Sequence, residues 1–219
     1  MNENKGRPSM VKNTIRLIGV ISVAILVANC VGFGQEKLIS VNITPPAKKF
    51  EKTVFAYTLK YFNAFGVEIG VAHAENEAFE KAVKEEVEAC KCFKEYEILE
   101  LKDFSKEKLP KNTSVIYYDI QYKETTNPVL RTLGNFVSLG TLGIIPAGYH
   151  LEISTDVKLY DKSAKELKAQ MYKNQITLIG GTSMVFVIPF MEERPFILSG
   201  VTNQFLSGLV GANLITFAR

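Results

Sequence analysis

The sequence predicts an α+β fold: an antiparallel sheet with a long C-terminal hairpin, packed helices and two apolar loops, after an N-terminal signal segment. Residues 151–160 and 166–179 alternate apolar and polar side chains on either side of a short turn, as the strands of a β-hairpin do. Residues 74–90 place apolar side chains at helical spacing, opposite a face of Glu and Lys. The 219 residues, 47% apolar and 22% charged, have the composition of an ordinary globular domain.

The N-terminus consists of a basic segment followed by an uncharged apolar run and a cysteine. Residues 1–29 hold four Lys and Arg side chains and one Glu, which accounts for the whole formal charge of +3. Residues 17–28 form a 12-residue apolar run, which is the length of a signal-peptide core. As a helix it would be about 18 Å long, short of the roughly 30 Å hydrocarbon core of a bilayer. We expect residues 1–29 to be removed as a signal peptide.

The expected removal of this segment sets the domain organisation and the class of partner. Residues 30–36 then form a short tether, and residues 37–219 form a single α+β domain. Because the excess of basic residues lies in the segment that is removed, the remaining chain is formally neutral, and we predict no nucleic-acid partner.

The apolar run ends in Leu26-Val27-Ala28-Asn29-Cys30, which resembles the lipobox of bacterial lipoproteins: an aliphatic residue, two small residues and the cysteine that is lipidated. Asn29 stands where Gly, Ala or Ser is usual, so the motif is similar to the permissive lipobox of spirochaetes. The resemblance implies a diacylglyceryl thioether on Cys30 and an added acyl chain, such as palmitate, on its amino group after cleavage. Val31 in place of Asp implies sorting to the outer membrane rather than the inner one. The alternative is a chance cysteine at the end of an apolar run.

The first half of the domain is predicted to contain several strands and one clear helix. Residues 38–43 alternate in polarity and indicate a strand that ends at Pro45. Residues 52–65 have a helix-like apolar stripe, but their aromatic content also allows a strand. The helix is expected over 74–90. Further strands are predicted over 67–71, 95–101 and 114–122, with a Lys-rich loop over 102–113.

The second half contains two apolar runs, residues 129–149 and 176–191, at the two ends of the predicted hairpin. An antiparallel pairing brings both runs to the same edge of the sheet, and a C-terminal helix is expected over 195–215. Three alternatives are open for the runs: packed core loops, insertion into a membrane interface, or two short membrane spans within 129–191. The side chains that would contact a membrane are Leu142, Ile144, Ile145, Val185, Phe186 and Ile188.

Few residues offer catalytic chemistry. His73 and His150 are the two histidines, and no nucleophile elbow, phosphate-binding loop or zinc-ligand spacing occurs in the sequence. We therefore name no catalytic or metal-binding residues and expect no cofactor besides the lipid on Cys30. Cys90 and Cys92 are two residues apart; free thiols, a local or intermolecular disulfide, and a metal or redox role are all open.

These observations favour a lipid-anchored protein of the cell envelope that acts without catalysis as a binding or assembly component. Its partners would be the membrane, through the lipid on Cys30, and a further envelope protein. The alternatives are a hydrolase of the envelope or periplasm that uses His73 or His150, and a protein with two short spans within 129–191.

Overall fold

The computed structural model describes residues 30–34, 38, 41–70, 73–180, 197–212 and 214. These residues form two compact units that alternate along the chain. The first unit holds 30–32, 127–149 and 178–180, and the second holds the other described residues. This division reflects contacts within the folded chain. The signal-peptide boundary before Cys30 and the start of the domain at residue 37 are not tested by it and stay predictions.

The described chain has the mixed α and β content that the sequence predicts, which confirms the α+β class. The seven strands form one sheet in the order β1-β7-β6-β5-β2-β3, and β4 also pairs with β2. The strands are β1 Cys30–Gly34, β2 Thr53–Phe62, β3 Glu68–Ile69, β4 Tyr96–Glu100, β5 Ser114–Glu124, β6 Ala147–Tyr160 and β7 Glu166–Gly180. The helices are α2 His73–Cys90, α3 Pro128–Gly140 and α4 Ile197–Gly211, with a short 3₁₀ turn, η1, over Lys106–Lys108.

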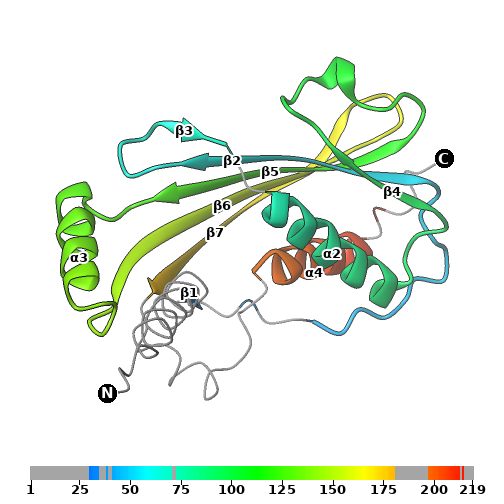
Figure 1. The fold of residues 1–219 in the computed structure, drawn as a ribbon. Coiled ribbons are helices and arrows are strands. Elements are labelled where there is room, and N and C mark those ends of the chain that lie inside the picture. Colours follow the sequence, from blue (N-terminus) through cyan, green and yellow to red (C-terminus); the bar gives the residue numbers. More distant parts are fainter. Residues whose placement is uncertain are drawn as a thin grey trace, which may run out of the picture. The chain divides into compact units, whose positions relative to one another are not determined.

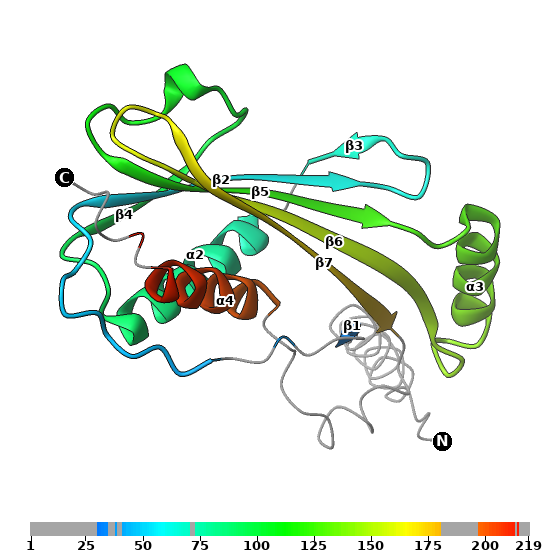
Figure 2. The ribbon, with the colours of Figure 1, turned by 180° about the vertical axis from the view of Figure 1, so that it is seen from behind.

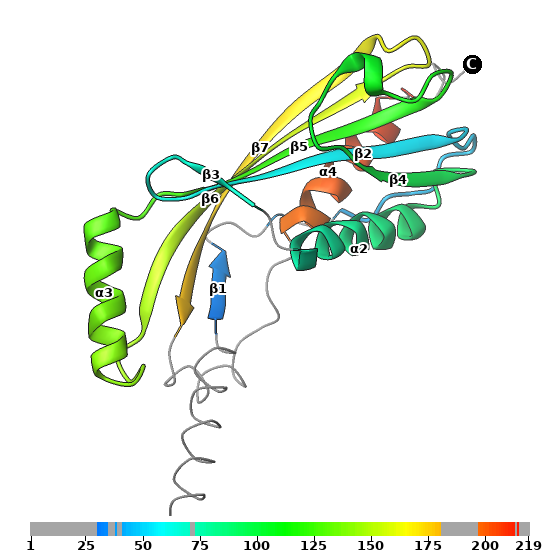
Figure 3. The same ribbon diagram turned by 45° about the horizontal axis from the view of Figure 1, so that its top comes forward.

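Strand β2 lies inside the sheet, between β5 and β4 (Figure 3). It runs parallel to both, with Phe55 opposite Ile116 of β5 and Ile98 of β4. Its first six residues are buried on both faces, so β2 lacks the apolar and polar alternation of a half-exposed strand. The strand alternative for 52–65 is therefore right and the helical one is wrong. The parallel pairs also correct one detail of the prediction, because the sheet is mixed and not antiparallel throughout.

The predicted C-terminal hairpin is formed by β6 and β7, which are neighbours in the sheet. The backbone N–H of Asp161 donates to the carbonyl of Lys165 at 2.9 Å. The Asp161 carboxylate accepts hydrogen bonds from the N–H groups of Ser163 and Lys165. Such an aspartate stabilises a tight turn by replacing backbone acceptors. Along β6, alternate residues from Leu151 to Leu159 are buried, as the alternation in the sequence predicts.

Helices α2 and α4 lie on one face of the second unit's part of the sheet (Figure 1, Figure 2). The core between them and the strands contains Phe79, Val83 and Val87 of α2 and Val201, Phe205 and Leu209 of α4. The buried stripe of α2 thus confirms the predicted helix over 74–90. A hydrogen bond of 3.0 Å from the Tyr57 hydroxyl to Glu80 joins β2 to α2. Desolvation, together with this carboxylate, raises the pKa of the Tyr57 phenol, so that the phenol stays a donor.

Three further predictions from the sequence need correction. Residues 30–34, expected as part of a tether over 30–36, form strand β1 of the sheet. Residues 41–43 belong to no strand, although a strand was expected over 38–43. The N–H of Val41 donates to the side chain of Asn203 at 2.7 Å instead of to a neighbouring strand. In addition, most of the first apolar run is not a loop, because residues 128–140 form helix α3 and strand β6 begins at residue 147. Residues 181–191 of the second run lie outside the described residues.

Replacing Phe79 by Ala should destabilise the second unit strongly. The Phe79 ring is fully buried and lies 4.4 Å from the Tyr57 ring and 5.2 Å from the Tyr118 ring, between centroids. We expect Phe79→Ala to lower the free energy of unfolding by about 3–5 kcal/mol in a urea titration. The matched control is Phe65→Ala, because Phe65 is 77% exposed, and we expect a change within about 0.5 kcal/mol. Equal losses for the two variants would contradict this description of the core.

Candidate functional site

Helix α3 of the first unit begins at residues that favour a helix start, and it ends in a turn that contains Gly143. The Asn127 side chain accepts a hydrogen bond from the N–H of Val129 at 2.9 Å, and Pro128 occupies the first turn. At the other end, Gly143 has a positive φ of 76° and its N–H donates to the carbonyl of Ser138. This bond spans the last turn as a C-terminal cap does. The boundaries of α3 are thus fixed by local sequence.

The apolar side chains of α3 and of the turn after it are exposed. No residue of this helix is buried, and the exposed fractions of these side chains run from 41% for Val137 to 74% for Val129. We call this set the α3 apolar surface: Val129, Leu130, Leu133, Phe136, Val137, Leu139, Leu142, Ile144 and Ile145.

The less exposed side of α3 is polar. Residues Arg131, Gly134, Ser138 and Thr141 are only partly exposed, and their spacing of three or four places them in one stripe along the helix. The guanidinium of Arg131 lies 5.0 Å from the centroid of the Tyr149 ring, in the same unit. A helix at the surface of a globular domain normally turns its apolar face inward. In α3 the apolar face is the exposed one, which is the opposite of this arrangement.

These exposures decide among the three alternatives for the described part of the apolar runs. Leu142 and Ile144 are about as exposed as Phe136, so core packing is wrong for this segment. None of the helices in the described ranges is long and apolar enough to cross a bilayer. Leu142, Ile144 and Ile145 therefore remain candidates for membrane contact. Val185, Phe186 and Ile188 lie outside the described residues.

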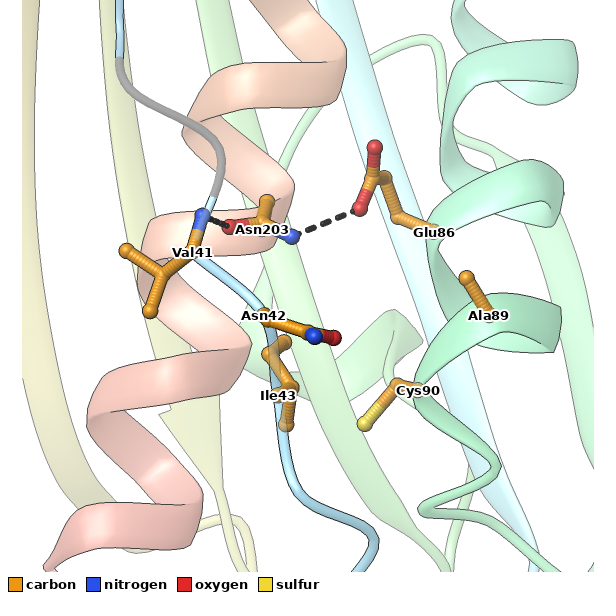
Figure 4. A pocket seen from close by; sticks show the side chains of 7 residues that line it. All are labelled: Val41, Asn42, Ile43, Glu86, Ala89, Cys90 and Asn203. Carbon is orange, nitrogen blue, oxygen red and sulfur yellow. Dashed lines mark hydrogen bonds between the residues drawn. The ribbon is translucent and has the colours of Figure 1, made fainter.

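The second unit has a cleft of about 310 Å³ beside α2 (Figure 4). Segment 41–43 forms one wall, and α2 and α4 contribute the others. The residues that line the cleft are Val41, Asn42, Ile43, Glu86, Ala89, Cys90 and Asn203.

A chain of hydrogen bonds joins the three walls of the cleft. One carboxylate oxygen of Glu86 accepts from the Ser199 hydroxyl, and the other accepts from the Asn203 amide at 2.9 Å. The oxygen of the same amide accepts from the Val41 N–H. Figure 4 shows Asn203 between Val41 and Glu86. Its amide thus connects segment 41–43 on one side with α2 on the other.

Helix α4 also lies close to Leu38, which precedes segment 41–43 in the chain. A Cβ atom at Gly200 would lie 2.6 Å from the Cβ of Leu38, closer than two such atoms can approach. Glycine has a low helix propensity, but at position 200 the close packing requires it. It allows Leu38 to lie against the helix.

The chemistry of the cleft suits binding better than proton transfer. Among the described residues that line it, Glu86 has the one ionisable side chain, because Cys90 is joined to Cys92 by a disulfide. Both oxygens of the Glu86 carboxylate already accept hydrogen bonds, so they are held in place. Asn42 is exposed at the mouth of the cleft and offers an amide donor and acceptor. The arrangement fits a small polar ligand held by hydrogen bonds.

The remaining candidate residues are not brought together. His150 is exposed, its Nδ1 lies 2.9 Å from the Thr177 hydroxyl, and it does not line the cleft. His73 is the first residue of α2, and its side chain is not among those that the structure describes. The disulfide between Cys90 and Cys92 agrees with one of the alternatives for that pair. In the described ranges, no group of three or more His, Cys, Asp and Glu side chains is placed to hold a metal ion.

Sequence reasoning singled out Leu142, Ile144 and Ile145 of the α3 apolar surface, but it missed helix α3 itself and the cleft. Helix α3 could have been found, because Asn127-Pro128 is a helix-start signal and Val129, Leu133 and Val137 follow at intervals of four. Its orientation could not have been found, since periodicity gives the apolar face but not what that face contacts. For the cleft there was no signal, because Glu86 and Asn203 are 117 residues apart.

Comparison with known proteins gives no family and only distant likenesses. No family model matches the chain, and no curated protein matches it. Among solved structures, the chain is similar to a minor lipoprotein from Acinetobacter baumannii, at 10% identity and a TM-score of 0.35, over 73% of this chain and 92% of the other. It is also similar to a Helicobacter pylori homolog of a neuraminyllactose-binding hemagglutinin, at 10% identity and a TM-score of 0.38, over 82% and 92%. At these TM-scores neither likeness informs the role of this chain.

Replacing Asn203 by Asp should separate the walls of the cleft. The variant loses the donor to Glu86 and places a second carboxylate beside it, so we expect a loss of about 1–3 kcal/mol in the free energy of unfolding near neutral pH. Repulsion raises the pKa of the pair in the folded state, and the loss should shrink as the pH falls and one carboxyl takes up a proton. The control is Asn42→Asp at the exposed mouth. Urea titrations at several pH values measure the free energy of unfolding of both variants. An equal loss with an equal pH dependence would contradict the hydrogen-bond network.

Proposed function

We propose that this protein is an acylated lipoprotein of a bacterial cell envelope that acts as a non-catalytic binding or assembly component. The observation that carries the proposal is the end of the apolar run at Cys30, after a basic segment and in a lipobox-like sequence.

A binding role is supported by the cleft beside α2. Its walls come from three separate parts of the chain and are held by the hydrogen bonds of Asn203, so its shape is formed before a ligand arrives. Its carboxylate is engaged in hydrogen bonds. A preformed cleft of this size and polarity is suited to a small molecule or to a side chain of a partner protein.

The membrane to which the lipid attaches follows from the residue after the cysteine. Val31 stands where an Asp would retain a lipoprotein in the inner membrane, by resemblance to lipoprotein sorting rules. We therefore favour the outer membrane, with a further envelope protein as a partner. Two or more acyl chains suffice for stable anchoring, at about 0.8 kcal/mol for each buried CH₂.

Replacing Cys30 by Ser should abolish acylation. The thioether needs the sulfur of this residue, so Cys30→Ser should lose metabolic labelling by fatty acid and should leave the membrane fraction or accumulate uncleaved. The control is the double variant Cys90→Ser, Cys92→Ser, which removes the two other cysteines and should keep its label. Intact mass of the wild-type protein reports cleavage and acylation together. A mass that includes residues 1–29 and an unmodified Cys30 would overturn the proposal.

A further inference from the structure

We infer that the α3 apolar surface inserts into the interface of a lipid bilayer, so that the protein contacts the membrane through a helix as well as through its acyl chains. This inference rests on the proposed lipid anchor and names a second site that acts with it. Four observations support it: the orientation of α3, the hydrogen bonds of the turn that follows, the charge of the segment, and the fact that α3 and residues 30–32 belong to the same unit.

The orientation of α3 gives the surface its lipid-like character. Its polar stripe, with Arg131 and Ser138, is the less exposed one, whereas Val129 and Phe136 on the opposite side are 74% and 69% exposed. Single exposed apolar residues are common, but a contiguous set on one helix and its following turn marks a membrane or protein contact. At 13 residues α3 is about 20 Å long, which suits a helix that lies in the plane of the interface.

The turn after α3 has its backbone donors satisfied internally. The N–H of Leu142 donates to the carbonyl of Leu139, and the N–H of Gly143 donates to the carbonyl of Ser138. Thr141 accepts the other two bonds: its carbonyl from the N–H of Ile144 and its hydroxyl from the N–H of Ile145. The hydroxyl in turn donates to the carbonyl of Val137 at 2.9 Å. In a bilayer each unsatisfied backbone group costs several kcal/mol, so irregular backbone enters lipid poorly. For its N–H groups, this turn presents Leu142, Ile144 and Ile145 without that cost.

The charge of the segment also fits lipid headgroups. Residues 125–151 contain no Asp or Glu, and Arg131 is the one Lys or Arg among them. Anionic lipids attract a cation and repel carboxylates. Arg131 and Tyr149, which stack on each other, are of the residue types that lie at the boundary between headgroups and acyl chains.

The unit that holds α3 also holds the proposed site of acylation. Residues 30–32 of β1 belong to the first unit together with 127–149 and the end of β7. In the sheet, β1 is next to β7, and β7 is next to β6, which follows α3 in the chain. A lipid on Cys30 would hold this unit at the bilayer, where even a weak apolar contact is favoured by the high local concentration.

Lipid accounts for these features better than a protein partner does. Protein interfaces carry about one hydrogen bond for each 100–200 Å². The amides of residues 142–145 already have acceptors within the turn, and the side chains of the α3 apolar surface have no polar atoms. The surface therefore offers a partner protein few groups for hydrogen bonds, whereas contact with the acyl chains of a bilayer requires no hydrogen bonds.

The test uses tryptophan fluorescence, because the natural chain contains no Trp. The full-length variants F136W and F65W are expressed with their N-terminal segment, purified in acylated form and placed in vesicles of phosphatidylethanolamine and phosphatidylglycerol. Both positions are exposed, but Phe65 lies in the second unit, between β2 and β3. We expect blue-shifted emission from F136W and quenching by lipids with brominated acyl chains that is several-fold stronger than for F65W. Adding L133E, a charge within the surface, to F136W should remove most of that quenching.

Each outcome decides one of the two proposals. Equal quenching of F136W and F65W in protein whose mass shows acylated Cys30 would overturn insertion of α3 and leave the lipid anchor in place. Blue-shifted F136W emission without bromine quenching would also overturn it and would indicate a second copy or another protein on this surface. Quenching of F136W in protein whose mass shows an unmodified Cys30 would support insertion and overturn the anchor.

Discussion

The pairing of β2 on both of its edges is the constraint on which the second unit depends. A strand that is hydrogen-bonded to β5 and β4 and buried on both faces has no exposed side, so its neighbours and the helices are placed around it. Parallel pairing of β2 and β4 needs a long connection, and α2 is part of it. Phe79 and Val83 of α2 then complete the core against the sheet, and α4 lies beside α2.

The cleft is a consequence of this arrangement. Because Asn203 on α4 bonds both Glu86 on α2 and the backbone of Val41, segment 41–43 is held over the two helices and away from the sheet. The polar groups of the cleft are thus part of the packing of the unit. A ligand site of this kind gains affinity because its groups are already oriented.

The first unit presents the opposite chemistry: an apolar surface followed by a turn whose N–H groups are hydrogen-bonded within the turn. Its features follow from a few local residues: Asn127 and Pro128 begin α3, and Gly143 ends it. The surface and the proposed lipid on Cys30 belong to the same unit, so one physical role, contact with lipid, can account for both. The cleft belongs to the other unit, so the two candidate sites share no residues.

The sequence by itself determined the elements whose signals are local. Alternation in 151–160 and 166–179 gave the hairpin, the stripe of 74–90 gave α2, and the end of the apolar run singled out Cys30. Only the tertiary structure decided what depends on distant residues. It showed that β2 is a buried parallel strand, that residues 41–43 pack on α4, that Glu86 meets Asn203, and that α3 faces outward. The physical reason is that periodicity reports which side of an element is apolar, whereas the neighbour of that side is chosen by packing and hydrogen bonding across the whole chain.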